Sequence, residues 1–159
     1  MNISMKNVSY NDRMSEETSC FSAGICVDGK KAGNASNRGQ GGSTMIDPPD
    51  LGQRINAYAK TLPPVQAYDM TLEMNADMLL GRLLEQFLLR RDMKAALRKR
   101  VLFVRAGKPA IFQTKAMQAA ELTALLANPK AIAGFTAETV LNLVSEDAAF
   151  ALYLKGQPA

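Results

Sequence analysis

Residues 90–109 read RRDMKAALRKRVLFVRAGKP and mark the change from a helical to an extended sequence pattern. VLFV at 101–104 is a short apolar run rich in β-branched and aromatic residues, which favour strands. AGKP at 106–109 has the Gly and Pro that are typical of a turn, and AIFQT follows it. We therefore predict a short β-hairpin made of VLFVR, AGKP and AIFQT. A single loop between two helices is the alternative.

The residues before this hairpin, 71–99, have the spacing of a long helix. Their apolar side chains recur at three and four residues and form one wide stripe. The stripe is broad enough to meet two neighbours, which indicates a dimer or bundle interface; an ordinary core helix is the alternative. The residues predicted to contact a partner protein are Leu72, Leu79, Leu80, Leu83, Leu84 and Phe87.

Basic charge is concentrated at the end of this helix and in the hairpin. Residues 90–109 hold eight basic side chains and one acid, whereas the formal net charge of the whole chain is +4. Arg91, Lys94 and Arg98 are three or four residues apart, so their like charges repel on one helix face. DNA phosphates would remove that repulsion. The alternative is a solvated helix C-terminus, where cations suit the helix dipole. The predicted DNA-binding residues are Arg90, Arg91, Lys94, Arg98, Lys99, Arg100, Arg105 and Lys108.

Residues 1–49 are predicted to be a flexible, disordered N-terminal tail. Six of the eleven glycines lie between Gly24 and Gly42, with Ser and Asn in the gaps. A segment of this composition buries too little apolar surface to offset the entropy lost on ordering. Residues 50–159 are then predicted to form one mainly α-helical domain, which begins with a short helix at 51–60.

Two further helices are predicted at 115–127 and 137–147, with Thr114 and Thr136 as their N-caps. A helix–turn–helix is one interpretation of this pair. However, the second helix has three acidic residues and no basic residue, so it would repel the phosphates of DNA. We expect it to pack against the domain or a partner instead of reading bases.

The sequence offers little for catalysis or metal binding. It has no histidine and none of the common phosphate-binding, dinucleotide-binding or nucleophile motifs. Cys20 and Cys26 form a lone C-x5-C, whose spacing fits no metal or redox signature, and we expect free thiols in a reducing cytoplasm. There is no secretory signal, and no apolar run reaches the roughly 20 residues of a membrane span. We expect a cytoplasmic, non-enzymatic protein without a metal, a cofactor or a membrane contact.

Several segments resemble the FlhD family, which provides the D subunit of the flagellar master transcriptional activator. YDMTLEM (68–74) and MLLGRLL (78–84) resemble the first helix of that family, which opens Y-D-x-N-L and runs into Q-R-L. AIFQT (110–114) resembles its A-M-F-R-L segment. FTAETVLNLVSEDAAFALYL (135–154) resembles its last segment by pattern more than by identity.

This resemblance implies a helical subunit that dimerises and joins an FlhC-like subunit, which in the family carries the zinc site. Gly81, Asp147 and Ala151 depart from the Gln, Asn and Cys of the family at these positions. The basic segment lies in an insertion before AIFQT. These departures make the chain more similar to the branch on conjugative plasmids and integrative elements, where the family activates transfer genes.

Together, these features predict a DNA-binding subunit of a heteromeric transcriptional activator. Its predicted partners are double-stranded DNA, an FlhC-like subunit and a second copy of itself. The main alternative is a non-enzymatic interaction adaptor or chaperone that uses the apolar helix 72–88. A third hypothesis is an antitoxin-like repressor, because RAGKPA (105–110) after a strand resembles such proteins; the long preceding helix counts against it.

Overall fold

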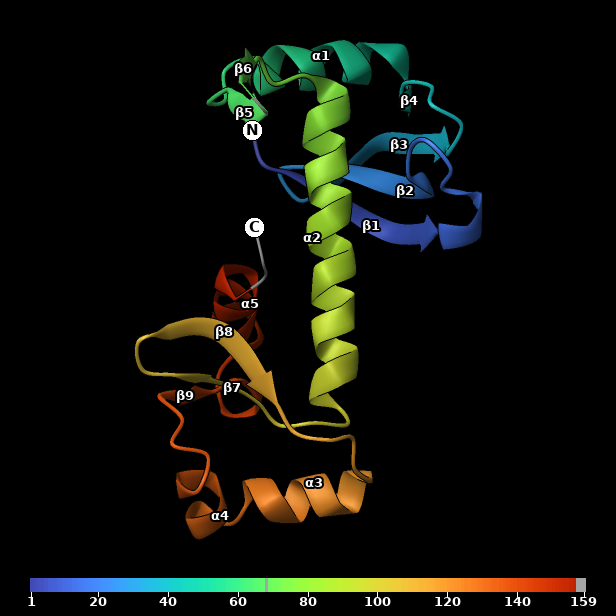
Figure 1. Ribbon diagram of the computed structural model, residues 1–159. Helices are drawn as coiled ribbons and strands as arrows, with labels where there is room; N and C mark the ends of the chain where they lie inside the picture. Colours follow the sequence, from blue (N-terminus) through green and yellow to red (C-terminus); the bar gives the residue numbers. More distant parts are fainter. Residues whose placement is uncertain (68, 157–159) are drawn as a thin grey trace. The chain divides into compact units, whose positions relative to one another are not determined.

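The computed structural model describes residues 1–67 and 69–156, and only the backbone of Ala67 and Pro109. Within these residues the chain is mixed α/β, with helices and three antiparallel sheets (Figure 1). The predicted mainly α-helical fold is therefore wrong. The chain divides into two compact units, Met1–Phe87 and Leu88–Ala159. Among the described residues, none of the helices combines the length and apolar character needed to cross a bilayer.

The first unit contains a four-stranded antiparallel sheet in which neighbouring strands follow one another along the chain, in the order β1-β2-β3-β4. A short 3-10 helix, Asp12–Met14, lies between the first two strands. The strands are β1 (Ile3–Tyr10), β2 (Cys20–Val27), β3 (Lys30–Arg38) and β4 (Met45–Asp47). This sheet occupies the segment predicted to be a disordered tail, so that prediction is also wrong.

An apolar alternation explains why this glycine-rich segment is ordered. Phe21, Ala23 and Ile25 of β2 are buried and share one face of the sheet, because successive side chains of a strand point to opposite sides. The turn between β2 and β3 is Asp28-Gly29, with φ angles of 49° and 81°. Two consecutive positive φ values are what a tight hairpin turn requires, and Asp-Gly adopts them readily. The sheet therefore contributes a row of buried apolar side chains to the core despite its glycines.

The glycine-rich loop after β3 is held by a group of hydrogen bonds. The carbonyl of Gly39 accepts the backbone N–H groups of residues 16–18 at 3.0, 3.0 and 3.3 Å. Asn37 Oδ1 accepts the Thr18 hydroxyl and the Gly39 N–H, both at 2.9 Å. Asn37 Nδ2 donates to the Gly42 carbonyl at 2.7 Å. These bonds fasten the β3–β4 loop to the β1–β2 loop.

Two helices complete the first unit. Helix α1 (Pro49–Ala59) packs against β4 and buries Leu51 and Ile55. Helix α2 (Ala76–Leu97) begins at α1, where the Ala76 N–H donates to Asn56 Oδ1 at 3.0 Å. A two-stranded ribbon of β5 (Val65–Ala67) and β6 (Met70–Leu72) connects the two helices.

The second unit is built around a three-stranded antiparallel sheet of order β8-β7-β9, together with the second half of α2. Its strands are β7 (Leu102–Arg105), β8 (Lys108–Gln113) and β9 (Thr139–Val140). Its other helices are α3 (Ala119–Leu126), α4 (Pro129–Ala133), the 3-10 turn η2 (Leu141–Leu143) and α5 (Glu146–Lys155). The hairpin predicted from VLFVR, AGKP and AIFQT is present as β7 and β8.

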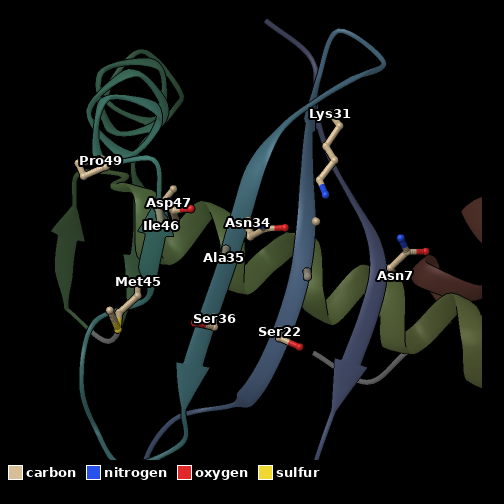
Figure 2. Close-up of a pocket in the computed structure, with 12 residues that line it drawn as sticks. Asn7, Ser22, Lys31, Asn34, Ala35, Ser36, Met45, Ile46, Asp47 and Pro49 are labelled. Carbon is tan, nitrogen blue, oxygen red and sulfur yellow. The ribbon is translucent and has the colours of Figure 1, made fainter.

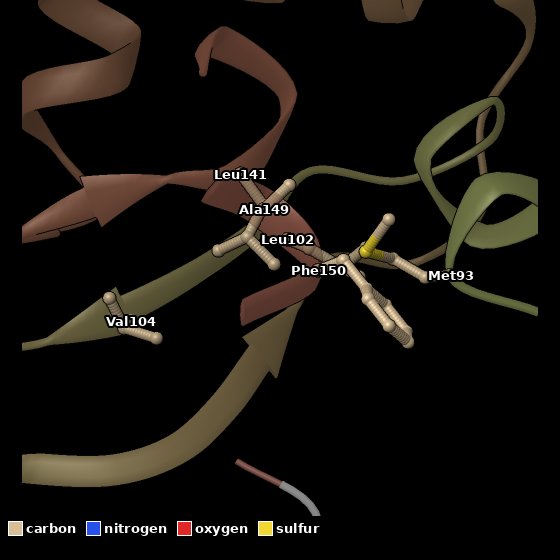
Figure 3. Close-up of a cluster of buried hydrophobic side chains, with 6 residues drawn as sticks. All are labelled: Met93, Leu102, Val104, Leu141, Ala149 and Phe150. Carbon is tan, nitrogen blue, oxygen red and sulfur yellow. The ribbon is translucent and has the colours of Figure 1, made fainter. Parts of the chain in front are cut away.

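The central strand β7 is buried on both faces. Leu102 and Val104 contribute to one apolar cluster and Phe103 to the other. The first cluster joins α2, η2 and α5 to the sheet (Figure 3), and it consists of Met93, Leu102, Val104, Leu141, Ala149 and Phe150. The second cluster consists of Val101, Phe103, Leu122 and Val140.

The helix predicted at 137–147 is not formed. Val140 instead pairs with Phe103, which makes this segment the edge strand β9. The helix begins later, at Glu146, where the Ser145 hydroxyl accepts the Ala148 N–H at 3.3 Å. Tertiary pairing therefore overrides the helical pattern of the sequence in this segment.

Candidate nucleic-acid interface

The predicted DNA-binding residues divide into a group with partners inside the chain and a group without them. They extend over the end of α2, the turn into β7, and the β7–β8 hairpin. Four have intramolecular partners, and these are Arg90, Arg91, Lys94 and Arg105. Among the described contacts, four have neither an ion pair nor a side-chain hydrogen bond, and these are Arg98, Lys99, Arg100 and Lys108.

Arg90 and Lys94 hold the first turn of α5. Arg90 Nη1 lies 3.1 Å from Glu146 Oε1 and 2.8 Å from Asp147 Oδ1, and Lys94 Nζ lies 2.9 Å from Glu146 Oε2. The Arg90 guanidinium also stacks over the Phe150 ring, 4.2 Å from its centroid. Both cations therefore contact α5 within the second unit, and their predicted role as DNA contacts stays a prediction.

The pKa of Glu146 gives this network a pH dependence. Hydrogen bonds from Lys94 and then from Arg90 lower the pKa of the Glu146 carboxyl below its ordinary value of 4.5. A carboxyl whose pKa is lower in the folded state stabilises the fold above its unfolded pKa, and this contribution is lost as pH falls through the folded value. We expect Glu146→Gln to make the free energy of unfolding less sensitive to acidification below about pH 4.5. Denaturant titrations across this range would check it.

The control for that experiment is Glu138→Gln, which changes another exposed glutamate of the second unit. Glu138 makes no side-chain ion pair in the described part of the chain. Its substitution should leave the acid dependence of the wild type intact. Equal acid dependence in wild type and Glu146→Gln would contradict the assignment.

Arg105 is also committed to internal contacts. Its guanidinium lies 5.4 Å from the ring centroid of Phe103 and 4.7 Å from that of Phe112. Its Nε donates to the Phe135 carbonyl at 3.3 Å. Arg91 Nη2 lies 3.0 Å from Oδ1 of its neighbour Asp92. The carboxylate partly neutralises the positive charge that Arg91 would present to a ligand.

The remaining cations gather at the turn between α2 and β7. Arg98, Lys99 and Arg100 lie in this turn, and the Met117 N–H donates to the Lys99 carbonyl at 2.9 Å. The segment leading into α3 therefore runs beside the turn and brings the exposed Lys115 close to it. We call Arg98, Lys99, Arg100 and Lys115 the basic turn. Lys108 lies apart from it, beyond β7 at the hairpin tip.

The basic turn has a rigid backbone. Asn142 Nδ2 donates to the carbonyls of Leu97 and Arg100 at 3.1 and 2.9 Å, and its Oδ1 accepts the Leu102 N–H at 2.9 Å. The Asn142 side chain thus bonds to the backbone at the start and at the end of the turn. Sequence reasoning missed Lys115 because the contact between its segment and the turn joins residues that are distant in the sequence.

The predicted partner-contact residues lie mainly inside the chain. Leu79, Leu80 and Leu84 are 7%, 0% and 2% exposed, so they form part of this chain's own core. Leu83 and Phe87 are half-buried, whereas Leu72 on β6 is 37% exposed. The stripe is thus covered by the same chain for most of its length, as in the core-helix alternative.

Comparisons with known families, characterised proteins and solved structures find no match for this chain. Among the described residues, no group of three or more His, Cys, Asp or Glu side chains is arranged to hold a metal ion. The two cysteines are free thiols, with Cys20 half-buried and Cys26 buried. Function must therefore be inferred from the surface that the fold builds.

Proposed function

We propose that this chain is a non-enzymatic DNA-binding protein that contacts phosphates through the basic turn. The observation that carries the proposal is the contrast within one segment. The side chains of Arg90, Lys94 and Arg105 make internal contacts, whereas the four cationic side chains of the basic turn make no ion pair or hydrogen bond among the described contacts. Four like charges beside one another repel, and an array of phosphates relieves that repulsion.

The rigid backbone of the turn supports this proposal. Asn142 fixes the turn through three hydrogen bonds, so binding would order side chains and not the main chain. Ordering costs reduce affinity, and a preformed surface reduces those costs. Phosphate contacts of this kind give affinity without base specificity.

A role in a transcriptional activator with an FlhC-like zinc-carrying partner stays a prediction from the sequence resemblance. The helical dimerising fold that the resemblance implied is not the fold of this chain, so the DNA-binding proposal rests on the basic turn alone. Co-purification with an FlhC-like protein, followed by zinc analysis, would test the activator role separately. A protein that purifies alone would contradict that role and leave DNA binding to its own experiment.

The test of DNA binding is its dependence on salt. Replacing Arg98, Lys99, Arg100 and Lys115 by Gln should weaken binding to duplex DNA. The slope of log K against log salt should flatten by about 3 to 4 units, because each phosphate contact contributes about 0.9. Fluorescence anisotropy with a labelled duplex at several salt concentrations measures both quantities.

A matched control variant removes four positive charges at other positions. Arg54, Lys60, Lys130 and Lys155 are exposed and make no side-chain ion pair or hydrogen bond in the described residues. Replacing these four by Gln should leave the slope close to that of the wild type. If both variants flatten the slope equally, binding reflects total charge and the proposal fails. If wild type binds no duplex, the adaptor alternative takes its place.

A further inference from the structure

One face of the four-stranded sheet in the first unit is uncovered. Residues paired across neighbouring strands share a face, and two such rows point away from the buried side. One row is Ser9, Ser22, Ser36 and Met45, and the other is Lys6, Gly24, Asn34 and Asp47. Figure 2 shows Ser22, Asn34 and Ser36 on adjacent strands of this face, with α2 behind the sheet. We call it the open face.

The open face forms a continuous trough. Two hollows of about 610 and 630 Å³ lie on it, and they share Ser22 and Ser36 as part of their floor. A third, smaller hollow continues along Arg38 and Gln40 toward the glycine-rich loop. A trough made of joined hollows suits an extended polymer better than a compact small molecule.

Cations stand along this trough. Lys31 lines one end and Arg38 the other, and at about 3.3 Å per residue these two positions on β3 are roughly 23 Å apart. Lys6 lies between them on β1, on the open face but outside the lining of the hollows. In the described part of the chain none of the three has an ion pair, and Asp47 contributes a negative charge to the lining. The trough is therefore net positive.

The floor of the trough is rich in hydrogen-bond donors, and methionine side chains also line it. Hydroxyl and amide side chains are the groups that proteins use, with Lys and Arg, to contact phosphate and sugar oxygens. Asn and Gly are poor strand formers, so strand propensity does not explain their presence on this face. Met45 and Met14 line the trough and are 69% and 53% exposed. A thioether packs favourably against an aromatic ring.

The bulge in β1 adds a polar group to the same surface. Asn7 has a φ of 52° and lies where the β1–β2 register shifts, and it lines the first hollow. Bulges re-aim a side chain and are frequent beside binding sites. The amide of Asn7 makes no side-chain hydrogen bond in the described part of the chain, so it is free to bind a ligand.

We infer that the open face binds single-stranded nucleic acid. Lys6, Lys31 and Arg38 neutralise phosphates, the serine and asparagine side chains donate to backbone and sugar oxygens, and the methionines contact the bases. This site lies in the first unit and uses none of the residues of the basic turn, so it goes beyond the proposed duplex contact. An acidic polypeptide would satisfy the cations, but it offers no aromatic base to the methionines.

The test uses labelled oligothymidylate and oligouridylate of about ten nucleotides, within the range that one single-strand-binding domain covers. Ser22→Glu with Ser36→Glu places two carboxylates on the floor at exposed positions. We expect this variant to bind both oligonucleotides at least about 10-fold more weakly, because each carboxylate repels phosphates. The control is Gln53→Glu with Ala57→Glu on α1, which adds the same charge at exposed positions outside the lining and should bind like wild type.

A second variant tests directly what the three cations contribute to binding. Replacing Lys6, Lys31 and Arg38 by Gln should flatten the salt slope for single strands by about 2 units, at about 0.7 per phosphate. Its affinity for duplex DNA should not change, whereas the basic-turn variant should bind duplex DNA more weakly and keep single-strand binding. Preference between the two oligonucleotides would tell whether RNA or DNA is the ligand.

Three outcomes would overturn the inference. They are no single-strand binding by wild type, unchanged binding by the Ser22→Glu and Ser36→Glu variant, and equally tight binding of a polyglutamate peptide of similar length. Each is separate from the duplex experiment, so the open face can fail while the basic turn holds, and the reverse.

Discussion

Gly39→Ala should destabilise the protein by about 3 to 5 kcal/mol, because three costs add at this position. Gly39 has a φ of 86°, which costs a residue with a side chain about 1 to 2 kcal/mol. A Cβ there would also overlap the Met14 carbonyl oxygen, so the backbone must shift. That shift weakens the three hydrogen bonds that the Gly39 carbonyl accepts, each worth about 0.5 to 1.5 kcal/mol.

The matched control lies in the same loop. Gly42 does not have a positive φ, and a Cβ there would meet no atom within 4 Å. Gly42→Ala should therefore change the free energy of unfolding by less than about 0.5 kcal/mol. Urea titrations followed by circular dichroism measure both variants. Equal stability of the two variants would mean that the loop is not held as described.

Leu141→Ala should cost the second unit about 2 to 5 kcal/mol. Leu141 is 1% exposed and packs in the cluster that includes Met93, Leu102 and Phe150 (Figure 3). Truncation removes its transfer free energy and leaves a cavity between α2, β7 and α5 that rigid neighbours only partly fill. A loss of less than about 1 kcal/mol would show that the cluster can collapse around the gap.

Leu143 provides the comparison from the same 3-10 turn. It is 56% exposed, so Leu143→Ala removes contact mainly with water. Its effect should stay within about 0.5 kcal/mol of zero. The pair of variants separates burial from the local propensity of the turn, because both change leucine to alanine in one short element.

The local elements were predictable where the pattern and the fold agree. The α2 helix follows from its three-and-four spacing, and the β7–β8 hairpin from an apolar run before Gly107. The sheet of the first unit was missed because its glycines suggested disorder. Asp28-Gly29 between alternating apolar residues is a strong hairpin signal, and it was available in the sequence.

The errors in the second unit have a different cause. The sequence predicts Thr136 as a helix N-cap, but Ser145 has that role, because Val140 pairs with a strand far away in the sequence. The ion pair between Arg90 and Glu146 joins positions 56 residues apart, which no local pattern reveals. The sequence therefore predicts where the basic segment lies, but it does not predict which of its cations have partners within the chain.

Helix α2 belongs to both units, and this limits how the protein could be rearranged. The division falls between Phe87 and Leu88, near the middle of its 22 residues. A chain cut there would carry about three helical turns on either side, too short to be stable in water on their own. One unit would then end, and the other would begin, in the middle of a helix. Moving either unit into another protein with its helix uninterrupted would therefore require the whole of α2 to be included.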